Sequence, residues 1–321
     1  MKLTGPLCLA LALAVPMHAA AQSYPSKPIH FVVPYPAGGP LDAVARLLGQ
    51  KVSESVREPV IVENKAGAGG NIGADAVAKS PPDGYTILMG AVATHAINPT
   101  LYASIPYDPV RDFIPVTQVA STPNVLVVNP SLPVKSVPDF VAYAKANPGK
   151  LNFGSGSTGS AGHLAGELFK SMAGIDMTHI PYKGAAPAMQ ALIAGDVQLM
   201  FDNLASSLGQ IRAGNVRALA VTTARRSALA PELPAIAESG LPGFDIGTWF
   251  GIFVPAATPR DVVEKLHGEF TRALAERDVR DTMLKLGAEP VGSRPEEFAA
   301  YIRAEAQKYA RIIKASGAKA D

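Results

Sequence analysis

The sequence predicts an α/β protein of two lobes that are joined by two extended strands. Short apolar segments alternate along the chain with segments of helical periodicity, a pattern typical of parallel strands with helices on both faces of the sheet. Glycine-rich loops follow strand candidates in both halves of the chain. Two extended stretches, residues 113–124 and 247–254, bracket a separate α/β block. This layout predicts a hinge, with closure of the lobes around a ligand.

Residues 1–21 have the features of a secretory signal peptide. Lys2 supplies a positive charge, residues 7–15 form a compact apolar run, and residues 19–21 (AAA) are a cleavage site of the A-x-A type. The apolar run is too short to span a bilayer, and a retained membrane anchor is the alternative interpretation. We expect cleavage of this segment and a soluble mature protein in the periplasm.

The first third of the mature chain predicts three strands with two helices between them. The strand candidates are apolar and rich in β-branched residues, and the helix candidates repeat apolar residues every three or four positions. In order, these elements are strand 29–33, a helix with Val44 to Val52 on its apolar face, strand 59–62, helix 72–79 and strand 85–89. We interpret the glycines of residues 67–73 as a structural connection.

The remaining chain repeats the alternation and then becomes helical. The extended segments are poor in helix formers, and a long amphipathic helix is predicted close to the C-terminus. In order, the elements are an extended segment 113–124 that leads to strand 125–128, helix 138–146, strand 151–153, helix 164–172, a strand that ends at 182, helix 188–194, strand 197–201, helix 204–213, strand 216–222, an extended segment 248–254 and helix 295–313. We expect domain 1 to comprise residues 22–123 and 247–321, and domain 2 residues 124–246.

The composition excludes several classes of function. Cys8, the only cysteine, lies in the predicted leader, so the mature chain has no thiol for a disulfide, a nucleophile or a metal. The net charge is +2 and the basic residues form no run, which argues against a nucleic-acid partner. The six histidines lack metal-binding spacing and the carboxylates are not clustered. We expect a monomer without a metal or cofactor.

The loop of residues 154–160 has the composition of an anion-binding site. It contains only Gly, Ser and Thr and lies between a predicted strand and the start of a helix. Glycines let backbone N–H groups converge, hydroxyls add donors, and a helix start carries partial positive charge. The loop of residues 34–42 has the same plan in the other half of the chain. Because ligands of parallel sheets lie at the carboxyl ends of strands, we expect both loops to face one cleft.

A nucleotide enzyme is an alternative interpretation of the same stretch. Gly154, Gly156 and Gly159 match the pattern G-x-G-x-x-G, and Asp176 follows about 20 residues later. An exported dinucleotide-dependent enzyme therefore stays open on sequence alone. His163 lacks a nucleophile, because no G-x-S-x-G motif surrounds any serine, and we interpret it as orienting the loop. We expect no enzymatic activity.

Four long motifs occur in order through the mature chain. They are YPSKPIHFVVPYPAGGPLD at 24–42, HIPYKGAAPAMQALIAGDVQLMFDN at 179–203, RALAVTTARRSALAPELPAIAESGLPGF at 217–244 and TWFGIFVPAATP at 248–259. Through these motifs and the central loop the chain resembles the tripartite tricarboxylate transporter receptor family, exported solute-binding proteins also called Bug proteins. The resemblance implies a two-lobed type II periplasmic binding protein fold with two mixed sheets. It also implies a small carboxylate ligand and delivery to membrane permease subunits.

The resemblance also implies which residues line the cleft. On the first loop they are Tyr35, Ala37, Gly38, Gly39 and Asp42, and on the second Ser155, Thr158, Gly159, Ser160, Ala161 and His163. Ser157 stands where similar proteins usually have glycine, so it adds a hydroxyl that can alter ligand preference. We add Thr94, Tyr182 and Asp202 as further ligand-contact candidates. We expect Ser160→Ala to weaken carboxylate binding without a comparable loss of stability.

Several alternatives stay open at this point. Asp42 either caps the first helix and ties down its loop or reaches the ligand through water. Asp202 either receives a ligand ammonium group or makes a buried hydrogen bond, and Trp249 belongs either to the core or to the pocket wall. The ligand itself is a dicarboxylate, a tricarboxylate, an aromatic acid or an amino acid. A receptor that signals to a membrane sensor kinase would use the same pocket.

Overall fold

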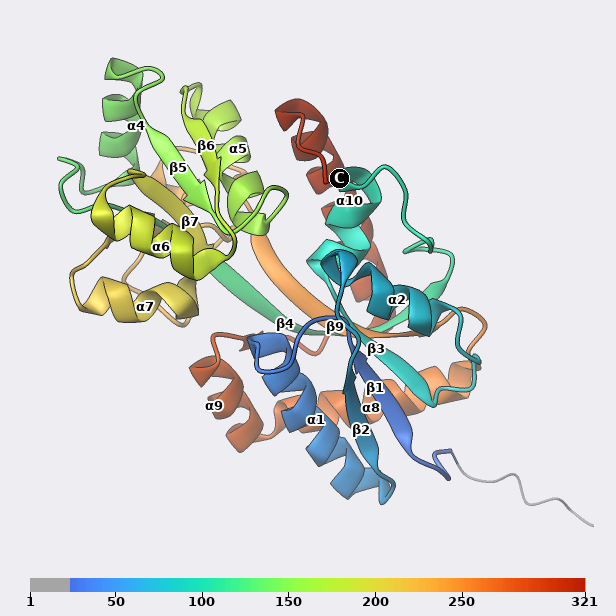
Figure 1. The fold of residues 1–321 in the computed structure, drawn as a ribbon. Coiled ribbons are helices and arrows are strands. Elements are labelled where there is room, and N and C mark those ends of the chain that lie inside the picture. Colours follow the sequence, from blue (N-terminus) through green and yellow to red (C-terminus); the bar gives the residue numbers. More distant parts are fainter. Residues whose placement is uncertain (1–23, 321) are drawn as a thin grey trace, which may run out of the picture.

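The computed structural model describes residues 24–320. The predicted signal peptide, with Cys8, lies outside the described residues. Figure 1 shows two lobes of strands and helices that are connected by two long strands, in agreement with the predicted layout. Among the described helices, none is long and apolar enough to cross a membrane.

The first lobe is built on a mixed sheet with helices on both faces. Its elements are β1 (Ile29–Val33), α1 (Pro40–Val56), β2 (Val60–Asn64), η1 (Ala68–Gly70), α2 (Asn71–Ala78), β3 (Thr86–Ala91), β9 (Gly247–Pro255), α8 (Arg260–Ala275), α9 (Arg277–Lys285) and β10 (Glu289–Pro290). Strands β1, β2 and β3 are parallel, whereas β9 runs antiparallel to β3. The carboxyl ends of β1 and β3 therefore open on the same edge of the sheet.

The second lobe has a smaller mixed sheet. Its elements are α4 (Val137–Ala146), β5 (Asn152–Ser155), α5 (Ala161–Ala173), β6 (Thr178–Pro181), α6 (Ala185–Ala194), β7 (Leu199–Asn203), α7 (Leu204–Arg212), β8 (Arg217–Val221) and the short turn η3 (Ala237–Ser239). Strand β5 pairs in parallel with β6 and β7. The loop predicted to hold an anion joins β5 to α5, at the carboxyl end of this sheet.

Strand β4 (Phe113–Val128) belongs to both sheets and is the main connection between the lobes. Its first part pairs antiparallel with β9, from Phe113 opposite Pro255 to Pro123 opposite Gly247. From Asn124 onward it pairs antiparallel with β7 and β8 of the second lobe. The two extended segments predicted to cross between the lobes are therefore adjacent strands.

Helix α10 (Pro295–Ser316), red in Figure 1, packs against elements of both lobes, including β4 and α5. The indole of Trp249 is fully buried and donates a hydrogen bond to Oε2 of Glu305 at 3.0 Å. The hydroxyl of Tyr309 donates to the backbone oxygen of Gly247 at 3.0 Å. Trp249 is thus a core residue that attaches α10 to the second crossing strand.

The structure contains elements that the sequence pattern did not predict between residues 93 and 101. A π-helical turn, η2 (Ala93–Ile97), runs into the short helix α3 (Asn98–Leu101). Pro99 lacks an N–H, so the regular hydrogen bonding of an α-helix is interrupted at this point. The turn follows the carboxyl end of β3 and therefore lies at the edge of the sheet where the first glycine loop also lies.

Candidate ligand-binding cleft

A cavity of about 330 Å³ lies between the lobes. Segments from both lobes and from both crossing strands form its walls. The lining residues are Tyr35, Pro40 and Leu41 near the start of α1, Ala91, Val92, Ala93 and Ile97 after β3, Thr122, Thr248 and Phe250 on the crossing strands, and Gly159, Ser160, Ala161 and Asn203 from the second lobe. This volume suits a small metabolite, because typical ligand sites start near 300 Å³.

The residues predicted from the sequence fall into two groups in this cavity. Tyr35, Gly159, Ser160 and Ala161 line it directly. The others surround the lining or lie deeper: Ala37, Gly38, Gly39 and Asp42 in the first loop, Thr94 in η2, Ser155, Ser157, Thr158 and His163 around the second loop, Tyr182 after β6 and Asp202 in β7. Both predicted loops therefore reach the same cleft, but only part of each faces its interior.

In the first loop, Asp42 is a buried carboxylate that ties the chain together. Its Oδ2 accepts hydrogen bonds from the backbone N–H of Gly38 at 2.9 Å and from Nε of Arg46 at 3.1 Å. Its Oδ1 accepts from Nδ2 of Asn64 at 2.8 Å. Burial alone would raise the pKa of Asp42, but these hydrogen bonds outweigh burial and lower it. The carboxylate is therefore fully occupied with its own loop.

Tyr35, in the first loop, and Thr94, in η2, both lie against Gly70. A Cβ at Gly70, whose φ is +97°, would lie 2.8 Å from Cγ2 of Thr94 and 3.2 Å from the Tyr35 ring, so only glycine fits there. The Thr94 hydroxyl is buried and donates to the backbone oxygen of Ala91 at 3.0 Å. Burial raises the pKa of the Tyr35 phenol, which keeps this wall of the cleft uncharged. Thr94 thus shapes the wall from behind.

In the second loop, most of the polar groups bond to one another. The Ser160 hydroxyl caps α5 by accepting the N–H of His163 at 3.3 Å, and it donates to the backbone oxygen of Ser157 at 2.8 Å. The Ser155 hydroxyl donates to the same oxygen at 2.9 Å. The side chains of Ser157 and Thr158 are exposed. The loop is consequently braced by its own hydroxyls.

Gly159 is held by His163 and lies close to the other lobe. Its N–H donates to Nδ1 of His163 at 2.9 Å, so this ring nitrogen is an acceptor. Its φ is +76°, and a Cβ at this position would lie 2.3 Å from the side chain of Leu101 in the first lobe. A residue other than glycine would therefore be strained and would also push the lobes apart.

His163 is stacked on His179 beneath the loop. The two rings are 3.8 Å apart between centroids with an interplanar angle of 14°, and Nε2 of His179 lies 2.7 Å from the Ser155 hydroxyl. Burial lowers the pKa of both imidazoles to about 4, so both are neutral at pH 7. This geometry is that of a rigid support for the loop, which is the orienting role interpreted for His163.

Some donors at the cleft remain without a partner among the described residues. The backbone N–H groups of Ala161 and Gly162 are in the first turn of α5, where no intrahelical acceptor exists. Oδ1 of Asn203 caps α7 by accepting the N–H of Ala205 at 3.1 Å, which leaves its Nδ2 donors free. The Thr122 hydroxyl is buried and makes no hydrogen bond. The N–H groups of Ala161 and Gly162 and the Nδ2 of Asn203 can bind an anion that enters the cleft.

A family model described as "Tripartite tricarboxylate transporter family receptor" matches residues 44–318. The chain belongs to this family. Protein BugT of Bordetella pertussis (strain Tohama I) is 39% identical over 301 residues, which cover 94% of this chain and 92% of BugT. The solved structure of R. palustris Rpa4515 with adipate is 40% identical, has a TM-score of 0.79, and matches 92% of this chain and 98% of the other. MatC from Rhodopseudomonas palustris with bound malate is 33% identical with a TM-score of 0.74, over 90% and 100% of the two chains.

As a receptor of this family, the protein has the type II periplasmic binding protein fold and is a solute-binding protein rather than an enzyme. The dinucleotide interpretation of the central loop is therefore wrong. The local geometry gives the physical reason, because Gly154 lies inside β5 and the N–H of Gly159 is committed to His163. Among the described residues, no group of three His, Cys, Asp or Glu side chains could hold a metal ion.

Asp202 lies next to the cleft of this receptor, but its carboxylate bonds to α7 and does not line the cavity. The residue is buried, and its Oδ2 accepts the Ser207 hydroxyl of α7 at 2.9 Å. Burial raises the pKa of Asp202. The neighbouring Asn203 lines the cavity instead, as expected for alternating side chains of a strand. Asp202 thus stabilises the position of α7.

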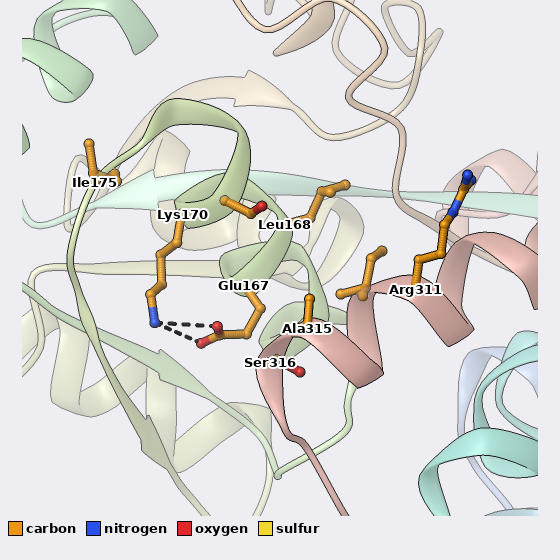
Figure 2. A pocket seen from close by; sticks show the side chains of 9 residues that line it. Glu167, Leu168, Lys170, Ile175, Arg311, Ala315 and Ser316 are labelled. Carbon is orange, nitrogen blue, oxygen red and sulfur yellow. Dashed lines mark hydrogen bonds and ion pairs between the residues drawn. The ribbon is translucent and has the colours of Figure 1, made fainter.

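The receptor has a second cavity of about 400 Å³, between α5 and α10 (Figure 2). Glu167 and Lys170 form an ion pair of 3.2 Å across one turn of α5, and Arg311 extends away from this pair in Figure 2. Neither glycine loop reaches this cavity. It is a groove between two packed helices and lies away from the carboxyl ends of the strands.

Sequence reasoning missed three polar residues of the cleft, namely Thr122, Thr248 and Asn203. On the crossing strands only Trp249 was considered as a pocket residue, whereas Thr122 and Thr248, opposite each other on the two strands, line the cavity. The sequence did contain a signal for Thr122 and Thr248. Both lie on the predicted crossing strands, and the crossing strands of a two-lobed protein form the floor of its cleft. Asn203 directly follows the strand that was predicted to end at the cleft.

Proposed function

We propose that the protein is an extracytoplasmic receptor that captures a small carboxylate between its lobes and delivers it to a tripartite tricarboxylate-type membrane transporter. The main support is the set of donors at the cleft, namely the first N–H groups of α5 and Nδ2 of Asn203, which have no hydrogen-bond partner among the described residues. Two relatives have structures with adipate and with malate, both of which are carboxylates. We further propose that it works as a monomer in the periplasm after removal of residues 1–21.

Backbone and neutral side-chain donors suffice for this binding. The cleft lining contains no lysine or arginine. Each hydrogen bond to a charged group contributes about 1.5–3 kcal/mol, and the helix start adds about 0.3–1 kcal/mol. Three or four such bonds offset an association cost of about 4–15 kcal/mol. The remaining free energy is compatible with micromolar affinity, about 8 kcal/mol.

The two lobes take different parts in this function. In the proposed division, residues 22–123 and 247–321 form one domain and residues 124–246 the other. The second domain supplies the helix start that receives the carboxylate. In the first domain, the N–H of Gly38 is already bonded to Asp42. A second carboxylate of the ligand would therefore meet residues 37–39 through water rather than directly.

A binding screen tests the proposal. The chain from residue 22 onward is titrated in a calorimeter with mono-, di-, tri- and aromatic carboxylates, amino acids and NADH. We expect one-to-one binding of at least one carboxylate class, no binding of NADH and no turnover of the bound acid. A ligand at about 100 times its Kd also stabilises the fold by about 2.7 kcal/mol, which a thermal melt detects. Binding of NADH alone would contradict the proposal.

A further inference from the structure

The cleft has a polar side and an apolar side. Thr122, Thr248 and Asn203 lie on its floor and on the second lobe, next to the start of α5. The wall of the first lobe is mostly apolar and includes Leu41, Val92 and Ile97, with the Tyr35 hydroxyl as the polar side-chain group among its lining residues. Hence most of the donors for a polar ligand group lie on one side of the cavity, and Tyr35 is the exception on the other side.

Thr122 is an exception among the buried threonines near the hinge. Its side chain is 4% exposed, lines the cleft, and has no hydrogen-bond partner among the described residues. By contrast, the Thr117 hydroxyl donates to the backbone oxygen of Ser293 at 2.8 Å, and the Thr222 hydroxyl donates to that of Asn124 at 3.1 Å. Buried hydroxyls are almost always paired, so the missing partner of Thr122 requires an explanation. A ligand in the cavity supplies one.

The apolar wall limits the rest of the ligand. A hydroxyl group on the ligand body would lose its water in the cleft and would face Leu41, Val92 or Ile97, which cannot replace those hydrogen bonds. An alkyl or aryl body would instead gain free energy from burial against the same side chains. The lining holds no charged side chain that would attract a polar body.

We propose that the ligand is an acid with an unhydroxylated alkyl or aryl body, and that the Thr122 hydroxyl donates a hydrogen bond to its carboxylate. The carboxylate lies between Thr122 and the first turn of α5, and the body packs on the apolar wall of the first lobe. This assignment rests on the proposed function as a carboxylate receptor. It names the class of acid and adds a binding residue on the hinge strand.

Matched pairs of acids test the ligand class. Hexanoate and gluconate have six-carbon chains with one carboxylate, and adipate and galactarate have six-carbon chains with two, so each pair differs in hydroxylation of the body. By calorimetry we expect the unhydroxylated member of at least one pair to bind about tenfold or more tightly than its partner, with no pair reversed. Equal or tighter binding of gluconate or galactarate would overturn the inference while leaving the receptor function intact. A folded protein that binds no acid of any class would instead overturn the proposed function.

Substitution of Thr122 tests the new binding residue. Thr122→Val keeps the shape of the side chain and removes the hydroxyl, and Thr178→Val is the matched control on an exposed position of β6. For the tighter of hexanoate and adipate we expect Thr122→Val to raise Kd about tenfold or more, whereas Thr178→Val leaves it unchanged. Since the hydroxyl has no protein partner, the urea midpoint of unfolding should not fall. An unchanged Kd in Thr122→Val would overturn the assignment.

Two further variants separate this role from a structural one. Thr122→Ser retains the hydroxyl and should bind the same acid within about threefold of the unaltered protein, whether or not Thr122→Val folds. Loss of affinity in Thr122→Ser equal to that in Thr122→Val would count against the hydrogen bond.

On the apolar wall, Leu41→Asn should reduce the preference for the unhydroxylated acid, and Leu47→Asn, on the same helix but outside the lining, should not. An unchanged preference in Leu41→Asn would remove the apolar wall from the proposal.

Discussion

At the scale of single residues, the Asp42 carboxylate lies near the proposed anion site, but its charge is compensated and does not repel the anion. Asp42 receives hydrogen bonds from Gly38, Arg46 and Asn64. Its charge is also paired with the Arg46 guanidinium, whose Nη2 lies 3.1 Å from Oδ1. The negative charge is thus compensated by its neighbours in the loop, in α1 and at the end of β2. Of the two roles open from the sequence, tying down the loop is the one for which these contacts provide the geometry.

Replacing Asp42 should destabilise the protein. Asp42→Ala leaves the Gly38 N–H without its acceptor and removes one of the two acceptors of the Asn64 amide, so we expect a loss of about 1–3 kcal/mol in the free energy of unfolding, measured in urea at pH 7. Because the folded pKa of Asp42 is lowered, its contribution is present above about pH 4, the unfolded value, and is lost as the pH falls through the folded value. The exposed Asp139→Ala in α4 is the control. A larger loss in the control would contradict this account.

The stacked histidines predict a loss of stability in mild acid. Burial lowers the pKa of His163 and His179 to about 4, whereas the unfolded chain takes up these protons near pH 6.5. The unfolded state therefore binds more protons between these values, and stability falls as the pH drops from about 6.5 to about 4. For His163 we expect a loss on the order of 1–2 kcal/mol between pH 7 and pH 5. His163→Asn should flatten the dependence of the urea midpoint on pH, and an unaltered slope would contradict this explanation.

At the scale of secondary-structure elements, α5 connects loop geometry to binding. Ser160 is its N-cap, and the residue also braces the loop through Ser157. This corrects the expectation that Ser160→Ala would affect binding without a comparable effect on stability. Removal of a serine N-cap typically costs about 1 kcal/mol. The same substitution frees the first turn of α5 from its anchor, so both properties should change together.

A pair of cap variants separates the two effects. Ser136 caps α4 in the same way, accepting the N–H of Asp139 at 3.2 Å, but α4 does not contribute to the cleft lining. We expect Ser160→Ala and Ser136→Ala each to lower the free energy of unfolding by about 0.5–2 kcal/mol. Only Ser160→Ala should also weaken binding of the tightest acid, by about 1 kcal/mol or more in calorimetry. Equal affinities of the two variants would show that the α5 cap does not position the carboxylate site.

Strands and helices followed from the sequence wherever burial alone decides them. The apolar run of residues 29–33 is β1, the extended segment 113–124 and the strand 125–128 together form β4, and the extended segment 248–254 lies in β9. The turn η2 did not follow, because Pro99 alters hydrogen bonding without changing the hydrophobic pattern. The internal bonding of the central loop was also missed. Which donors of Ser155, Gly159 and Ser160 remain free for a ligand depends on His163 and His179. His179 is 19 residues or more along the chain from these three residues.

At the scale of the whole molecule, the hinge consists of two paired strands and a helix that packs on them. The lobes are connected by β4 and β9, and their cleft opens where these strands leave the first sheet. Helix α10 lies on the hinge and is attached to β9 through Trp249 and Tyr309. Nζ of Lys308 is paired with Glu305 on the same helix and lies 3.7 Å from the carboxylate of Asp245, at the end of the second lobe. Rotation of the lobes must therefore take place around α10 rather than by separation from it.

This arrangement predicts a rotation of the lobes that can be measured as a distance. In the chain from residue 22 onward, which has no cysteine, Gln50→Cys on α1 and Lys183→Cys beside β6 place spin labels on exposed positions of the two lobes. We expect electron–electron double resonance to report a change in the mean label separation when a saturating acid is added, since the ligand contacts both lobes and stabilises the closed form. The pair Gln50→Cys and Lys79→Cys lies within the first lobe and should keep its distance.

The same samples decide whether binding and closure are coupled. With Thr122→Val added to the labelled pair, the change should require a correspondingly higher concentration of acid but should reach the same final distance, because this variant loses a ligand contact and no contact between the lobes. A label distance that does not change while calorimetry records binding would contradict closure and leave a rigid cleft. A distance that changes with Thr122→Val in the absence of acid would instead assign Thr122 to the hinge itself, through its position opposite Thr248.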